Sequence, residues 1–194
     1  MFQIRIHGRG GQGVVTAAEL LSIAAFREGK HAQAFPSFGS ERTGAPVAAF
    51  CRISEEPIRL REPISTPNAV IVQDPTLLHT HDLFAGLTED GYILVNSARS
   101  AATLGLGEIA SKLPPGHIMT LPATEIAREK IGRPIPNVAM LGALAGLTEV
   151  VTLDALSSAI KEKFSKSVAE KNIAAAKVAY EIIRTLAGTK KELA

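Results

Sequence analysis

The chain has 194 residues, of which 46% are hydrophobic and 21% charged, and its formal net charge at pH 7 is +2. This length and composition fit one well-packed globular domain and exclude disorder on a large scale. The charge is nearly neutral and the sequence contains no Trp and only two Tyr, which argues against nucleic acid as a partner, because binding nucleic acid needs positive charge and aromatic faces.

The chain opens with a predicted strand, glycine loop and helix. Phe2–His7 alternates apolar and polar residues, and Val14–Arg27 has apolar residues at helical spacing. Between them stands Gly8-Arg9-Gly10-Gly11-Gln12-Gly13. Glycines allow a sharp turn close to an anion, and the free N–H groups at a helix start carry positive potential. This unit is therefore predicted to be a phosphate-type turn, with Arg9 and Gln12 as additional donors.

Two further strands, Ala32–Phe35 and Val47–Ile53, are predicted on either side of a polar loop, Ser37–Pro46. Open α/β sheets bind ligands beyond the ends of their strands. The loop's hydroxyl, carboxylate and guanidinium groups consequently predict a binding or interface role for Ser40, Glu41 and Arg42. Residues 54–67 contain three prolines and are expected to form an irregular surface connection.

Apolar runs and helical periodicities alternate through the rest of the chain. Strands are predicted at Ala69–Gln73, Tyr92–Asn96 and His117–Leu121. Helices are predicted at Thr76–Phe84, Ala123–Ile131, Val138–Leu147 (capped by Asn137 and rich in Ala and Gly for close packing), Leu153–Phe164 and Ser167–Leu186, the last ended by Gly188-Thr189.

This order predicts an α/β fold that is Rossmann-like, with a mostly parallel sheet, helices on both faces and a helical C-terminal third. A single domain over residues 1–188 and a charged tail over 189–194 are expected.

The single cysteine, Cys51, excludes an internal disulfide and suits a reducing cytoplasm. One thiol also cannot hold an iron–sulfur cluster, and Cys51 lies in a strand-like run where a buried, inert thiol is expected. No apolar stretch approaches the roughly 20 residues that span a bilayer, and no signal peptide is visible, so a cytoplasmic location without a membrane partner is expected. Neither a metal site nor a catalytic residue is predicted, and His7 is expected to be a packing histidine.

The glycine motif leaves several readings open. NAD binding requires an acidic residue about 20 positions further on, and Lys30–Pro36 contains none. A phosphate-bearing ligand, the backbone of a partner and an empty tight turn all remain compatible with the motif.

Three segments together carry a resemblance to a family. Ile4–Gly13, Pro36–Pro46 and Pro136–Ala143 resemble the gamma subunit of 2-oxoacid:ferredoxin oxidoreductases, which include the pyruvate and 2-ketoisovalerate enzymes. The resemblance implies a subunit, not catalytic alone, of a complex that oxidatively decarboxylates a 2-oxoacid to an acyl-coenzyme A. Thiamine diphosphate, Mg and iron–sulfur clusters would lie on partner subunits, and ferredoxin or NAD would receive the electrons through them.

The resemblance also implies that this chain helps form the coenzyme A site and the subunit interface. The candidate residues are Gly8, Arg9, Gly10, Gly11, Gln12, Gly13, Ser40, Glu41, Arg42, Asn137 and Met140. Two alternatives are a stand-alone NAD(P)-dependent oxidoreductase and a purely structural assembly subunit.

Overall fold

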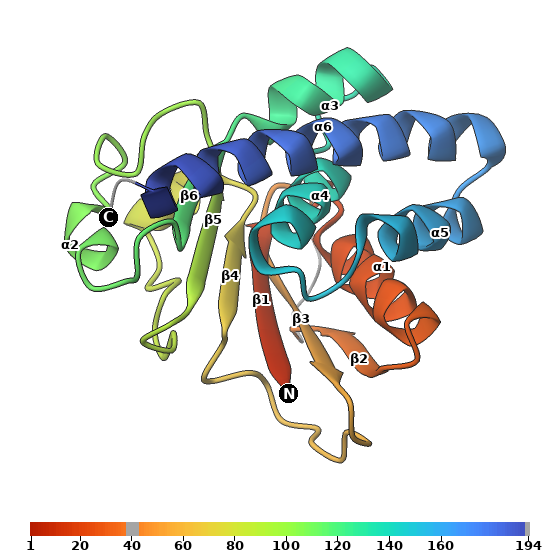
Figure 1. The fold of residues 1–194 in the computed structure, drawn as a ribbon, viewed down its shortest axis with the longest axis horizontal. Coiled ribbons are helices and arrows are strands. Elements are labelled where there is room, and N and C mark those ends of the chain that lie inside the picture. The colour runs from red at the N-terminus through yellow and green to blue at the C-terminus, as the bar shows by residue number, and fades with distance from the viewer. Residues whose placement is uncertain (38–42, 193–194) are drawn as a thin grey trace.

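The computed structural model describes residues 1–37 and 43–192. Within these residues, six strands form one sheet in the order β2-β3-β1-β4-β5-β6 (Figure 1). The strands are β1 (Phe2–Arg9), β2 (His31–Pro36), β3 (Pro46–Ser54), β4 (Ala69–Val72), β5 (Tyr92–Asn96) and β6 (Ile118–Leu121). β1, β4, β5 and β6 pair in parallel, whereas β3 is antiparallel to both of its neighbours. The predicted α/β class and the mostly parallel sheet are confirmed.

Helices cover the sheet unequally on its two faces. The longer helices gather over one face (Figure 1), and the short η1 and α2 pack on the other. The helices are α1 (Val14–Arg27), η1 (Pro75–His79), α2 (Gly107–Ala110), α3 (Ala123–Ile131), α4 (Asn137–Thr148), α5 (Leu153–Lys163) and α6 (Lys166–Glu192). The C-terminal third is helical, as predicted.

Alternation along the strands divides the buried side chains into two cores. On β4, Ala69 and Ile71 join the core under the long helices, while Val70 and Val72 join the smaller core under η1 and α2. Strand residues point alternately to opposite faces, so an uninterrupted apolar run supplies both cores. This is why β4 is apolar at every position.

On the sheet face that carries η1 and α2, the part formed by β1, β2 and β3 is polar. Arg52 is only 1% exposed there and donates hydrogen bonds to the side-chain oxygens of Gln3 and Gln33 and to the carbonyl of Glu62. Its guanidinium also lies over the Phe35 ring, 5.2 Å from the centroid. The predicted irregular connection 54–67 is confirmed, and Arg52 fastens it to the sheet.

The sequence predictions were wrong in extent at three elements. β1 continues through Gly8 and Arg9, which pair with Val47 and Pro46, so the turn begins two residues later than predicted. The helix predicted at Thr76–Phe84 is the short η1, and Arg5 donates hydrogen bonds to the carbonyls of Leu83 and Ala85 in the segment that follows it.

α6 also continues past its predicted end at Gly188-Thr189 and reaches Glu192. A lone glycine costs a helix only about 1 kcal/mol, which is too little to end it by itself.

Cys51 is fully buried in the main core, as predicted, and burial raises the pKa of its thiol to about 12. We expect a thiol-modifying reagent at pH 8 to react with the folded chain roughly a thousandfold more slowly than with the unfolded chain, since the thiolate is the reactive form. Stopped-flow labelling with and without urea measures the ratio. Equal rates would show that the thiol is accessible.

No helix in the described part of the chain is long and apolar enough to cross a membrane. Among the same residues, no group of three or more His, Cys, Asp or Glu side chains is arranged to hold a metal ion.

Candidate functional site

The glycine loop joins β1 to α1 at the carboxyl end of the sheet. Gly11 and Gly13 adopt positive φ values of 95° and 71°, a conformation that favours glycine. No side chain in the described part of the chain caps α1. Within residues 1–37 and 43–192, the N–H groups of Gly11, Gly13 and the first three residues of α1 donate no hydrogen bond. The loop therefore presents several free N–H donors, as a phosphate-type turn requires.

The glycines of the motif have different reasons to be glycine. A Cβ atom on Gly8 would lie 2.7 Å from the Val14 side chain, and one on Gly13 would lie 2.3 Å from Nδ2 of Asn137. A Cβ on Gly11 would meet nothing within 4 Å among the described residues. Gly8 and Gly13 are thus explained by close packing, whereas Gly11 borders open space.

The two predicted loop motifs meet in the structure. Gly10 forms a bridge with Thr43, its N–H donates to the Ala45 carbonyl, and its carbonyl accepts from the Gly44 N–H. The end of the Ser37–Pro46 segment therefore lies directly against the glycine loop. Ser40, Glu41 and Arg42, which were predicted to act here, lie outside the described residues.

Arg9 and Gln12 donate to protein groups and not into open space. Arg9 donates to the Gly44 carbonyl and to Thr76, and its Nε lies 3.3 Å from Oδ2 of Asp74. Gln12 accepts from the Arg9 N–H at 2.8 Å and donates to Asp74 at 2.9 Å. Both side chains thus hold the loop against the start of η1, a role that the sequence did not reveal because Asp74 is 62 residues from Gln12.

Asp74 is the centre of this network. Burial favours its neutral form, but hydrogen bonds from Thr76 and Gln12 and the charge of Arg9 outweigh that effect, so the pKa of Asp74 lies below its usual value. An ionised Asp74 accepts from both loop side chains at neutral pH. The loop's shape is therefore fixed by a charged, largely buried carboxylate.

Asn137 connects the glycine loop to α4. Its Nδ2 donates to the Gly13 carbonyl at 3.2 Å, and its Oδ1 accepts from the Val138 N–H. The predicted helix cap is therefore wrong in detail: Asn137 is the first residue of α4 and Pro136 occupies the cap position. Met140 lies one turn further on and is 0% exposed, so its side chain packs in the core below the loop.

A cleft of about 440 Å³ opens beside the loop. The glycine loop and α1 contribute Gly11, Gly13 and Thr16, and Asn137 joins them from α4. The other walls come from the segment before α4 and from the start of α6, namely Ile131, Arg133, Ile135, Phe164, Ser167, Val168, Lys171 and Asn172.

The cleft is positively charged and partly apolar. Arg133 and Lys171 are its charged lining residues, and neither forms an ion pair within the described chain. N–H groups and two cations that have no partner among the described residues, together with an apolar wall, suit a ligand with phosphate and aliphatic parts. The sequence had not singled out Lys171, because α6 comes to the cleft only through the tertiary fold, nor Thr16, which follows the glycine motif by three residues.

The geometry weakens the NAD reading of the motif. In the dinucleotide-binding fold the second strand lies next to the first and parallel to it. Here the antiparallel β3 stands between β1 and β2. The end of β2 is thus one strand too far away to place a ribose-binding carboxylate, and it carries no acid in any case.

The sequence matches the family described as pyruvate ferredoxin/flavodoxin oxidoreductase over residues 3–182. The chain belongs to this family. Pyruvate synthase subunit PorC of Methanothermobacter marburgensis is 51% identical over 181 residues, covering 93% of this chain and 97% of the relative. The pyruvate/ketoisovalerate oxidoreductases common subunit gamma of Pyrococcus abyssi is 50% identical, covering 93% of this chain and 96% of the relative.

Solved structures agree with this membership. The pyruvate oxidoreductase subunit PORC of Thermotoga maritima superposes with a TM-score of 0.78 at 40% identity, over 93% of this chain and 95% of that one. A 2-oxoglutarate:ferredoxin oxidoreductase of Magnetococcus marinus, solved with 2-oxoglutarate, coenzyme A and succinyl-CoA bound, shares the fold at a TM-score of 0.69 and 19% identity. The match covers 97% of this chain but only 31% of the larger chain. The resemblance to gamma subunits that was inferred from three motifs is confirmed.

Proposed function

We propose that this chain completes the coenzyme A site of a 2-oxoacid:ferredoxin oxidoreductase complex and supplies part of its subunit interface. The observation that carries the proposal is the cleft beside the glycine loop. Here Arg133 and Lys171 lie with the N–H groups of Gly11 and Gly13, which donate no hydrogen bond to any described residue. The enzyme would oxidise a 2-oxoacid and transfer the acyl group to coenzyme A in the cytoplasm.

The residues of the cleft fit the parts of coenzyme A. Phosphates would bind the loop N–H groups and the two cations, while Ile135, Phe164 and Val168 offer an apolar wall to the pantetheine arm. Ser40, Glu41 and Arg42 are proposed to border the same site from the segment that adjoins Gly10. Arg9, Gln12 and Met140 support it by holding the loop and packing beneath it.

The remaining chemistry is assigned to partner subunits. Thiamine diphosphate with Mg would decarboxylate the 2-oxoacid, and iron–sulfur clusters would carry electrons to ferredoxin or to an NAD-linked acceptor. The single cysteine of this chain supports that division, because a cluster needs more thiolates than one.

We expect Lys171→Glu to raise the KM for coenzyme A by about tenfold in the assembled complex and to leave the KM for the 2-oxoacid unchanged, because it replaces a phosphate partner with a like charge. Lys177→Glu is the matched control, since Lys177 is exposed on the same helix and does not line the cleft. Steady-state kinetics on complexes that contain each variant measure the effect.

An unchanged KM for coenzyme A in both Lys171→Glu and Gly11→Val complexes would contradict the proposal and favour a purely structural subunit. Gly11→Val disturbs the backbone donors in two ways, because valine disfavours the φ of 95° that Gly11 adopts and its side chain would enter the space beside the loop. Saturable NADH binding by the chain alone would instead support the stand-alone oxidoreductase.

A further inference from the structure

Among the strands of the described residues, β2 forms one edge of the sheet and has a neighbour on one side only (Figure 1). The Ser37 N–H donates to the Ala48 carbonyl. Because hydrogen-bonded positions alternate in an antiparallel pair, Phe35 and Gln33 also point their N–H and C=O groups at β3. Ala32 and Ala34 therefore point theirs away from the sheet. No hydrogen bond within residues 1–37 and 43–192 reaches these outward groups.

This edge lacks most of the usual protection against pairing. Edge strands are commonly guarded by lysine, inward-pointing charges or bulges. β2 reads His-Ala-Gln-Ala-Phe-Pro, pairs with β3 without a bulge and carries no lysine or acid. Pro36, at its end, removes one donor but leaves both alanines available.

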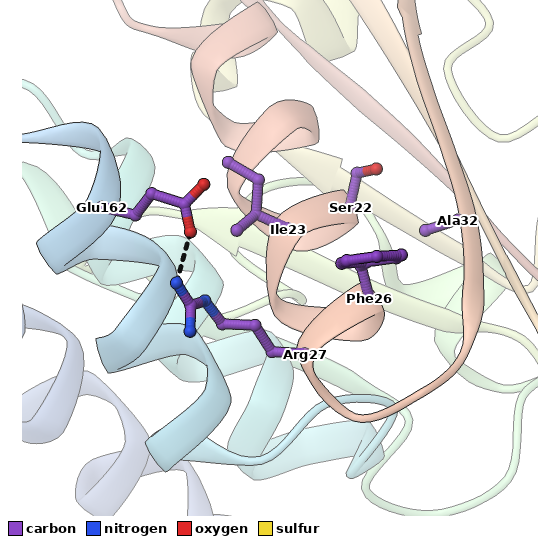
Figure 2. A pocket seen from close by; sticks show the side chains of 6 residues that line it. All are labelled: Ser22, Ile23, Phe26, Arg27, Ala32 and Glu162. Atoms are coloured by element: carbon purple, nitrogen blue, oxygen red, sulfur yellow. Dashed lines mark hydrogen bonds and ion pairs between the residues drawn. The ribbon is translucent and has the colours of Figure 1, made fainter.

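A cleft borders the edge on the helical face. It measures about 530 Å³ and lies between α1, α5 and Ala32. Figure 2 shows the Phe26 ring standing between α1 and Ala32, and this side chain is 75% exposed. The ion pair between Arg27 and Glu162 borders the cleft without leaving a net charge. An apolar side chain fits this face.

A second cleft borders the same strand on the opposite face. It measures about 490 Å³ and lies between Gln33, Phe35 and residues 58–61. Its charged lining residues are Arg59 and Arg61, both exposed and neither in an ion pair within the described chain. An acidic side chain fits this face.

We infer that an extended segment of a partner subunit pairs with β2 as a seventh strand of the sheet. Side chains of a strand alternate between faces, so this segment carries apolar residues toward Phe26 and acidic residues toward Arg59 and Arg61. The outward groups of Ala32 and Ala34 supply the backbone hydrogen bonds. The inference rests on the chain's being a subunit of a complex, and it is independent of where coenzyme A binds.

Charge disfavours a second copy of this chain as the occupant. Two copies paired through β2 about a two-fold axis would keep the same face of both sheets together. Arg59 and Arg61 of one copy would then share a face with those of the other, and β2 itself has no acid to offer them. A different subunit with acidic residues meets neither obstacle.

Ala34→Pro tests the backbone pairing. The outward N–H of Ala34 is lost and the ring blocks an incoming strand, whereas the hydrogen bonds from β2 to β3 come from the intervening residues and persist. We expect the affinity of the full chain for the other subunits to fall about tenfold or more, with the thermal unfolding of the chain alone little changed. Ala34→Ser, which keeps the N–H, is the matched control.

Two surface variants keep the test independent of folding. Phe26→Ser and the double variant Arg59→Glu with Arg61→Glu are also expected to weaken assembly about tenfold, and the wild-type affinity should decrease as salt is added. Arg128→Glu, an exposed arginine on α3, is the charge control. In every complex that still assembles, the KM for coenzyme A should stay at the wild-type value, which separates this interface from the coenzyme A cleft.

Wild-type affinity in Phe26→Ser and in the arginine double variant would overturn the inference, whatever Ala34→Pro does. A wild-type chain that dimerises alone, and loses the dimer in Ala34→Pro, would also overturn it and assign the edge to a second copy.

Discussion

Gly142→Ala is expected to lower the free energy of unfolding by about 3 kcal/mol, corresponding to a fall in Tm of about 10 °C. A Cβ atom at this position of α4 would lie 2.1 Å from the carbonyl oxygen of Ala176 and 2.6 Å from its Cα. Both atoms belong to the backbone of α6, so no side-chain rotation can relieve the contact. The helices would have to separate, which breaks close packing along their whole crossing.

Gly188→Ala is the matched control, because Gly188 also lies in a helix, α6, but a Cβ there meets none of the described atoms within 4 Å. That variant should keep or slightly raise the stability, since Ala has the higher helix propensity. Urea unfolding of the three proteins measures both effects. Equal stability of Gly142→Ala and wild type would mean that the two helices can move apart without cost.

The packing of α4 shows how far composition alone can predict a contact. The Ala- and Gly-rich sequence of this helix predicted close packing against a neighbour, and Gly142 and Gly146 do lie against Ala176 and Tyr180 of α6. The sequence did not identify α6 as that neighbour. Small residues in a helix indicate that another backbone packs closely against it. Which helix does so depends on the arrangement of all the helices on the sheet.

The strand predictions succeeded for a similar reason. Apolar runs and alternation are local signals, so the six strands were predicted almost to their ends. Strand order is not local, and the insertion of the antiparallel β3 between β1 and β2 was invisible in the sequence. That insertion is what separates this sheet from a dinucleotide-binding one, even though Gly8-x-Gly10-x-x-Gly13 matches the dinucleotide motif.

The candidate site was predictable in its loop but not in its walls. Free backbone donors follow from the glycine spacing, and Asn137 was expected beside them. Arg9 and Gln12 were expected to donate outward, yet Asp74 and Thr76 accept from them across more than 60 residues of sequence. Lys171 reaches the cleft only because α6 packs against α3, α4 and α5. Such contacts depend on the tertiary structure and leave no pattern in one sequence.

Acid is expected to destabilise the folded chain through His7 by up to about 3 kcal/mol as the pH falls from 6.5 to 4. Burial lowers the pKa of His7 to about 4, and the charges of Arg5 and His81 act in the same direction. The Nε2 atom is buried and finds no hydrogen-bond partner among the described residues, so the ring is held neutral. The unfolded chain binds a proton near pH 6.5 and the folded chain only near pH 4. The contribution of His7 to the free energy of unfolding is therefore fully present above pH 6.5 and is lost as the pH falls from 6.5 to about 4.

His7→Phe removes this proton while keeping a planar ring at the same place on β1. The variant should resemble wild type at pH 7 and exceed it in stability at pH 4, with the difference growing as the pH falls through the window. Carboxylates such as Asp74 also lose stabilising contacts in acid. The informative quantity is therefore the difference in unfolding free energy between wild type and His7→Phe. His31→Gln is the control, because His31 is exposed on β2. Urea unfolding at several pH values measures the difference. Parallel stability curves for wild type and His7→Phe would show that His7 binds its proton equally well in the folded and the unfolded chain.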